Sequence, residues 1–300
     1  MTTTQLHPRT GAARTGRILG SIFVHAWLAL AAIMIAVPLI WMILASFTPG
    51  KLLSGVSLIP DFSHFTWEHY AYLFTYKSQN SQATSDFVAS FLRSLSVAVL
   101  NTFVVVIFST MSAYVFSRFR FKGRRPLLIV LLLLQMFPSF MGMIALFLIF
   151  KSFGWLNQPL YFVTFYVASA VPYNIYLIRG FMRNIPMSLD EAARIDGASN
   201  LTVFFRIIFP LSVPILGFVA VNAFMQPWLD YIIPSQLLTP GRADTVALTI
   251  FRMTDPYETL IYNPLNFMAA GLLLTIPIVI VNLLSQRFII YGLTSGADKG

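Results

Sequence analysis

A polar and charged segment at 186–214 lies among long apolar stretches of this 300-residue sequence. Ser188 and Glu191 there have the spacing of a capping box, in which the serine oxygen accepts from a backbone N–H and the glutamate reaches back. This predicts a short helix over about 189–196, ended by Gly197, which tolerates a left-handed conformation. These residues stabilise the ends of a short polar helix. The function they indicate is therefore docking on another molecule rather than catalysis.

A second short helix is expected directly after the first. Ser199 or Asn200 can cap it, and it runs toward Pro210. An isolated helix of about two turns is marginal in water, because nucleation is unfavourable and few hydrogen bonds follow it. A short capped helix between membrane segments therefore indicates a surface that docks on another molecule.

Motifs for hydrolysis and nucleotide binding are absent from the sequence. There is no G-x-x-x-x-G-K-[ST] loop, no H-E-x-x-H and no G-x-S-x-G. Four scattered histidines and no cysteine offer no catalytic metal site. The sequence therefore predicts a non-catalytic chain whose energy source lies in another polypeptide.

Composition indicates an integral membrane protein. Hydrophobic residues make up 57 % of the chain and charged residues 10 %, against roughly a quarter charged in globular proteins. That leaves too little charge to cover a water-facing surface. The net charge of +9 is distributed between apolar segments, which argues against nucleic acid as a partner.

Six apolar segments predict transmembrane helices, with polar tails at 1–17 and 291–300. The first segment is much longer than the about 7–15 apolar residues of a signal peptide, so it is read as an uncleaved span. Together the spans form one membrane domain over 18–290. The predicted spans are 18–46, 87–116, 126–150, 159–178, 207–233 and 266–290.

The distribution of Lys and Arg predicts the orientation of these spans. With six spans, fourteen Lys and Arg fall on the side of the two termini and of the polar run, and six fall on the other side. Positive residues are enriched in cytoplasmic loops. Both termini are therefore predicted to be cytoplasmic, and the long loops 47–86 and 234–265 face outward.

The polar run resembles the EAA loop of inner-membrane permease subunits of ABC importers. Phe209 stands where the family pattern has leucine, so this chain departs from the pattern there but keeps the position apolar. Stretches at 113–124, 171–181 and 286–300 are similar to carbohydrate-importer permeases of the maltose/maltodextrin, MalG-type family. The residues that carry the EAA resemblance are Glu191, Ala192, Ala193, Gly197, Ile207 and Pro210.

The resemblance implies a six-helix type I ABC importer permease fold with a cytoplasmic coupling loop at about 186–206. In that family the EAA loop forms a coupling helix that sits in a cleft of the ATPase subunit. The coupling residues expected here are Ser188, Glu191, Ala192, Ala193, Asp196, Gly197 and Pro210.

The implied function is import of a sugar, either maltose/maltodextrin or a related oligosaccharide, across a bacterial cytoplasmic (inner) membrane. The implied partners are a second permease, two ATPase subunits that bind ATP and Mg, and an extracytoplasmic solute-binding protein. Trehalose, another glycoside or glycerol phosphate remain alternative cargoes. A membrane-embedded enzyme or structural subunit is the rival from another class, although no ionisable cluster at membrane depth supports an enzyme.

The fifth predicted span carries polar residues at helical spacing. Asn222, Gln226 and Asp230 are separated by four residues each, with Trp228 close by. One interpretation is a lining of the sugar path, in which amides bond hydroxyls and the aromatic ring stacks on the sugar. The other is interhelical packing, with Pro227 disturbing the simple face count.

The outward loop 234–265 resembles the loop that reaches the solute-binding protein in maltose-type permeases. A plain solvated loop is the alternative. The residues expected to make the contact are Arg242, Asp244, Asp255, Tyr257 and Glu258.

Overall fold

The computed structural model describes residues 11–51, 64–77, 85–136, 139–257 and 261–297, and within these ranges the regular structure is helical, without strands. This agrees with the all-α prediction. The helices are α1 Gly11–Ser46, α2 Glu68–Thr75, α3 Asp86–Arg118, α4 Arg124–Gln135, α5 Met143–Ser152, α6 Phe162–Met182, α7 Met187–Ile195, α8 Asn200–Val203, α9 Phe209–Leu229, α10 Ile232–Leu237, α11 Val246–Arg252 and α12 Pro264–Ala297.

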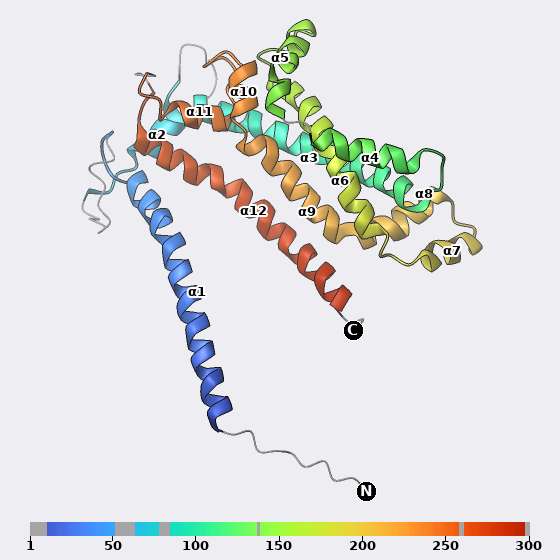
Figure 1. Ribbon diagram of the computed structural model, residues 1–300. Helices are drawn as coiled ribbons and strands as arrows, with labels where there is room; N and C mark the ends of the chain where they lie inside the picture. Colours follow the sequence, from blue (N-terminus) through green and yellow to red (C-terminus); the bar gives the residue numbers. More distant parts are fainter. Residues whose placement is uncertain (1–10, 52–63, 78–84, 137–138, 258–260, 298–300) are drawn as a thin grey trace.

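Helices α3, α6 and α9 form the centre of the bundle, and α12 lies along α9 (Figure 1). Val105 of α3, Ile178 of α6 and Val219 of α9 belong to one fully buried apolar cluster between them. Helix α1 diverges from this bundle along most of its length (Figure 1) and contacts α12. Among its residues from 20 onward, the buried ones lie in the last turn, where Ala45 and Ser46 are inaccessible. The three central helices therefore fix the positions of the loops at both ends.

Five described helical segments are long and apolar enough to cross a membrane. They correspond to the first, second, fourth, fifth and sixth predicted spans. The expected third span, 126–150, is instead divided into α4, a 3₁₀ turn at Ser139–Gly142 and α5. The sequence places Pro138, which lies outside the described residues, at this break. A proline removes a backbone donor and disfavours helix in the residue before it, so continuous apolarity did not produce a continuous helix.

The helices at the two ends of the chain are longer than predicted. Helix α1 begins at Gly11 and α12 ends at Ala297, so both continue into the segments expected to be tails. The two long loops predicted to face outward also contain helices, because α2 lies in the first of them and α10 and α11 lie in the second.

The short helices gather at the two ends of the bundle (Figure 1). Helices α7 and α8 lie at one end, whereas α2, α10 and α11 lie at the other. A π-helical turn at Phe204–Ile208 joins α8 to α9, and the Phe209 N–H closes it by donating to the Phe204 carbonyl. Pro210 has no N–H to donate to the carbonyl four residues earlier, which explains the wide turn at this place.

Candidate functional site

The short helix predicted at about 189–196 is present as α7, but it begins two residues earlier than expected. Pro186 occupies the N-cap position with an extended backbone and gives no side-chain cap. Ser188 is consequently the second residue of the helix, and the predicted capping box is wrong. Gly197 adopts φ +81° as expected. The Ala198 N–H donates to the Ala193 carbonyl at 2.9 Å, a bond of the Schellman type that closes a helix.

Helix α8 begins as the sequence predicts. The Ser199 hydroxyl accepts a hydrogen bond from the Thr202 N–H at 3.2 Å and so caps the helix. The chain then enters the π turn and α9, where Pro210 is the second residue and is exposed.

The expected coupling residues lie on two faces of α7. Glu191, Ala192, Asp196 and Gly197 are exposed, whereas Ala193 is half-buried against the central apolar cluster. The exposed face also holds large apolar side chains that sequence reasoning did not select, namely Ile195 at 87 %, Met187 at 47 % and Leu189 at 41 % exposure. Exposed apolar side chains around small residues are typical of a protein-binding surface.

An ion pair behind α7 was not predicted either. Arg118 at the end of α3 lies 3.0 Å from Asp190 of α7, and both side chains are 2 % exposed. The two residues are far apart in sequence, and Asp190 stands directly before the motif residue Glu191. Their charges were the available signal, but only the fold brings them together.

A cavity of about 670 Å³ lies between α6, α9 and the divided third span. Its wall is mainly apolar, and it is called here the polar cavity for the amide, hydroxyl and carboxylate groups on one part of that wall. Two residues predicted from the fifth span, Gln226 and Asp230, line it. The described residues that line the cavity are Leu134, Gln135, Gly142, Met143, Phe165, Tyr166, Ala168, Ser169, Pro172, Gln226, Asp230, Ile232 and Ile233.

Hydrogen bonds hold the polar side chains of this cavity in place. The Tyr166 hydroxyl donates to Asp230 Oδ2 at 2.8 Å. Gln226 Nε2 donates to Ser169 Oγ at 3.0 Å, and Gln135 Nε2 donates to the Ser169 carbonyl at 2.8 Å. The other oxygen of Asp230 accepts from the N–H of Ile232 at 2.8 Å and starts α10. The polar part of the cavity wall is therefore a fixed set of hydroxyl, amide and carboxylate groups, and the rest of the wall is apolar.

The other two residues predicted for the sugar path do not line this cavity. Asn222 Nδ2 donates to the Phe218 carbonyl of its own helix at 2.8 Å. Trp228 is fully buried, and its indole N–H donates to the Leu274 carbonyl of α12 at 3.1 Å. A residue turns through about 100° per position on an α-helix, so Trp228 points away from Gln226. Trp228 therefore packs α9 against α12, and the prediction of a sugar-stacking ring is wrong.

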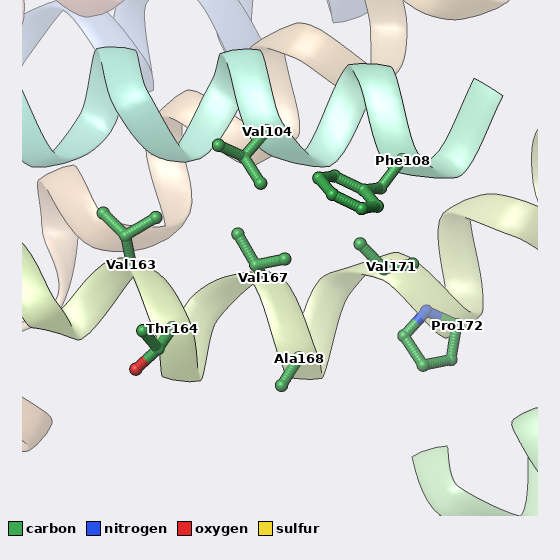
Figure 2. Close-up of a pocket in the computed structure, with 8 residues that line it drawn as sticks. All are labelled: Val104, Phe108, Val163, Thr164, Val167, Ala168, Val171 and Pro172. Carbon is green, nitrogen blue, oxygen red and sulfur yellow. The ribbon is translucent and has the colours of Figure 1, made fainter. Parts of the chain in front are cut away.

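A second hollow, between α3 and α6, is apolar (Figure 2). Val104 and Phe108 of α3 point toward Val167 of α6, and the volume is about 410 Å³. Its one hydroxyl, that of Thr164, donates to the Tyr161 carbonyl at 2.7 Å. A sugar in this groove would leave its hydroxyl groups unpaired, so the groove is not a carbohydrate site.

Asp244 in the predicted outward contact loop supports the structure of that loop. It is 6 % exposed, forms an ion pair with Arg252 and accepts from the Gly241 N–H at 3.0 Å. Arg93 of α3 donates to its backbone carbonyl at 2.7 Å. Such a carboxylate is not available to a partner.

The remaining residues of the predicted contact are more accessible. Arg242 is exposed, and Tyr257 is 94 % exposed. Asp255 Oδ1 accepts from the Tyr257 N–H at 3.0 Å and shapes the turn. Glu258 lies outside the described residues.

Comparison with known proteins places the chain among membrane transport components. The family model described as "Binding-protein-dependent transport system inner membrane component" matches residues 105–292. The galactooligosaccharides transport system permease protein GanQ of Bacillus subtilis (strain 168) is 37 % identical over 284 residues, covering 95 % of this chain and 97 % of the relative. The trehalose/maltose transport system permease protein MalG of Thermococcus litoralis is 36 % identical over 273 residues, covering 90 % and 94 %.

The fold has a counterpart among solved structures. A bacterial ABC transporter involved in the import of the acidic polysaccharide alginate contains a chain that matches with a TM-score of 0.71 at 22 % identity. The match covers 95 % of this chain and 99 % of that chain.

Proposed function

Because the chain belongs to the family of binding-protein-dependent transport system inner membrane components, we propose that it is the permease subunit of an ATP-driven importer for a neutral oligosaccharide. It is a non-catalytic membrane component, and separate ATPase subunits hydrolyse ATP. A second permease would complete the translocation path, and a solute-binding protein would deliver the sugar from outside.

The polar cavity is the observation that carries the proposal for a neutral cargo. Among the described residues that line it, none is Lys, Arg or His, and Asp230 is the single ionisable carboxyl. A phosphorylated or acidic cargo would bring negative charge next to Asp230 without a compensating cation. The amide of Gln226 and the hydroxyls of Ser169 and Tyr166 instead match the donors and acceptors of a sugar.

The exposed face of α7 supports the second half of the proposal, coupling to an ATPase. Its small residues Ala192 and Gly197 permit close approach, and Ile195 offers an apolar side chain for a pocket on the partner. Glu191 does not cap the helix as part of a box with Ser188, so its carboxylate is available for a charged group of the ATPase.

The proposed transport cycle alternates between outward-facing and inward-facing forms. Loaded binding protein and ATP favour different forms, and an equilibrium shifts only through such differences in affinity. The excess of Lys and Arg on the side of α7 supports a cytoplasmic position for α7 and for both termini.

For the cargo we propose maltose, maltodextrin or a related oligosaccharide. Relatives named for trehalose/maltose and maltodextrin transport support this choice. The relative named for galactooligosaccharides makes a galactooligosaccharide the alternative. Both classes of sugar would present neutral hydroxyl groups to the cavity, so the cavity does not distinguish them. Measuring which sugar the solute-binding protein binds would distinguish them.

The test is reconstitution in proteoliposomes of the full complex, expressed with its neighbouring permease, ATPase and binding-protein genes. The rate of ATP hydrolysis should rise when the binding protein loaded with the correct sugar is added. The sugar that gives this stimulation is the cargo. Gln226→Ala should raise the sugar concentration for half-maximal uptake about 3–10-fold, since one hydrogen bond is lost. Asn222→Ala is the matched control on the same helix and should leave uptake unchanged. A chain that purifies without any ATPase, or a complex that no sugar-loaded binding protein stimulates, contradicts the proposal.

A further inference from the structure

The Arg118 guanidinium connects three elements at the α7 end of the bundle. Its Nε lies 3.0 Å from Asp190 Oδ2 of α7. One terminal nitrogen donates to the carbonyl of Met182, the last residue of α6, at 3.1 Å, and the other donates to the Ile185 carbonyl in the turn before α7, also at 3.1 Å. Arg118 is itself the last residue of α3. One side chain thus joins α3, the end of α6 and the coupling helix.

The rest of α7 has little hold on the bundle. Its exposed face is turned away from the spans, and on its inner face Ala193 supplies half-buried packing. A helix of nine residues does not hold its place by its own stability. The position of α7 relative to α3 and α6 therefore depends strongly on the contact between Arg118 and Asp190.

Burial makes this contact resistant to separation. Both side chains are 2 % exposed, and a charge left alone in such a place loses its partner without gaining water. Among the described residues, neither Asp190 oxygen has a hydrogen-bond partner, and Arg118 Nε has none either, so the Arg118 charge at 3.0 Å is what compensates this buried carboxylate. A force on α7 moves Arg118 with it before it breaks the pair.

We propose that Arg118 and Asp190 form the rigid joint through which displacement of α7 is passed to α3 and α6. Both are positioning residues for coupling, since neither touches the cargo or the exposed face of α7. This inference rests on the proposed function, in which the ATPase moves α7. It assigns the transmission of that movement to a pair outside the docking face.

The first test measures sugar taken up per ATP hydrolysed in the reconstituted complex. Asp190→Asn preserves size and removes the charge, so uptake per ATP should fall at least tenfold while the complex still assembles and hydrolyses ATP. Asp190→Glu keeps the charge and should retain most of the ratio. The double variant Arg118→Met with Asp190→Leu fills the same buried site with apolar side chains and leaves no buried charge. It should be more stable than Asp190→Asn, but its uptake per ATP should stay low.

A matched control on α3 separates coupling from stability. Asn101 is fully buried and donates from Nδ2 to the Ala223 carbonyl of α9 at 2.7 Å. Asn101→Leu removes a buried hydrogen bond between spans without touching α7. It should lower stability yet leave the uptake per ATP at the wild-type value.

The second test measures the geometry of the joint directly, first in a complex that keeps Arg118 and Asp190. The chain has no cysteine, so single cysteines can be introduced at Arg194 of α7 and at Val115 of α3, both of which are exposed. The distance between spin labels there should stay the same with and without ATP in the otherwise wild-type complex. In Asp190→Asn it should broaden or shift.

The outcomes separate this inference from the proposed function. Wild-type uptake per ATP in Asp190→Asn, or a label distance that changes with ATP in the wild type, overturns the joint. A wild-type complex that no loaded binding protein stimulates overturns the proposed function instead.

Discussion

Replacing Gly197 by valine should uncouple ATP hydrolysis from uptake through the backbone alone. Gly197 has φ +81°, and a Cβ built on it meets no atom within 4 Å. The penalty is therefore conformational: a left-handed non-glycine residue costs about 1–3 kcal/mol, and valine is among the least tolerant residues there. The native turn should lose population by about 5- to 150-fold.

Loss of the native turn should change the orientation of α7, because Gly197 ends that helix. The Gly197 N–H donates to the Arg194 carbonyl at 3.0 Å, and a relaxed turn would change the angle between α7 and α8. In proteoliposomes, Gly197→Val should hydrolyse ATP but take up sugar at least tenfold less per ATP. Gly197→Asn should stay close to wild type, since asparagine tolerates the left-handed region.

A second glycine provides the matched control. Gly154, in the turn after α5, has φ +69°, and its Cβ position is equally open. Gly154→Val imposes similar strain far from α7 and should reduce stability without changing uptake per ATP. If Gly197→Val keeps the wild-type ratio, or if Gly154→Val lowers it to the same degree, the reasoning from the α7 turn is refuted.

Three further variants test other parts of the structure. Trp228→Ala should destabilise the protein by about 3–5 kcal/mol, measured by unfolding in mixed micelles, and an unchanged stability would contradict its role between α9 and α12. Asp244→Ala removes the acceptor for Arg252 and for a backbone N–H and should cost about 1–3 kcal/mol, seen as faster proteolysis in the 234–265 loop. Ile195→Asp should change stability by no more than about 0.5 kcal/mol yet weaken binding of the ATPase at least tenfold in a pull-down; retained binding would exclude Ile195 from the docking face.

Apolar segment length and helix-end residues were the reliable signals in the sequence. Five long apolar segments became helices close to the predicted bounds, because a chain in lipid must satisfy its backbone internally. Gly197 and Ser199 ended and began helices where expected. The capping box failed because Pro186 supplies an extended start that places Ser188 inside the helix.

Features that depend on tertiary contacts were not accessible in the same way. Their spacing in the sequence placed Asn222, Gln226 and Asp230 on one helical face. Over the eight positions from Asn222 to Asp230, however, an α-helix turns about 80° past a whole number of turns, so Asn222 does not face the cavity. Tyr166, which lines the same cavity, comes from another helix. The pairing of Arg118 with Asp190 requires that the ends of α3 and α6 meet first.

The division of the third span gives the cavity a wall that contains both sides of a helix break. Leu134 and Gln135 from one side of the break and Gly142 and Met143 from the other all line the cavity. Irregular backbone at membrane depth persists where water or protein satisfies its carbonyl and amide groups. In the proposed transport cycle, a sugar that enters here would exchange hydration water for similar hydrogen bonds, so its residence should be short. Weak binding of this kind allows a transported molecule to leave the site again.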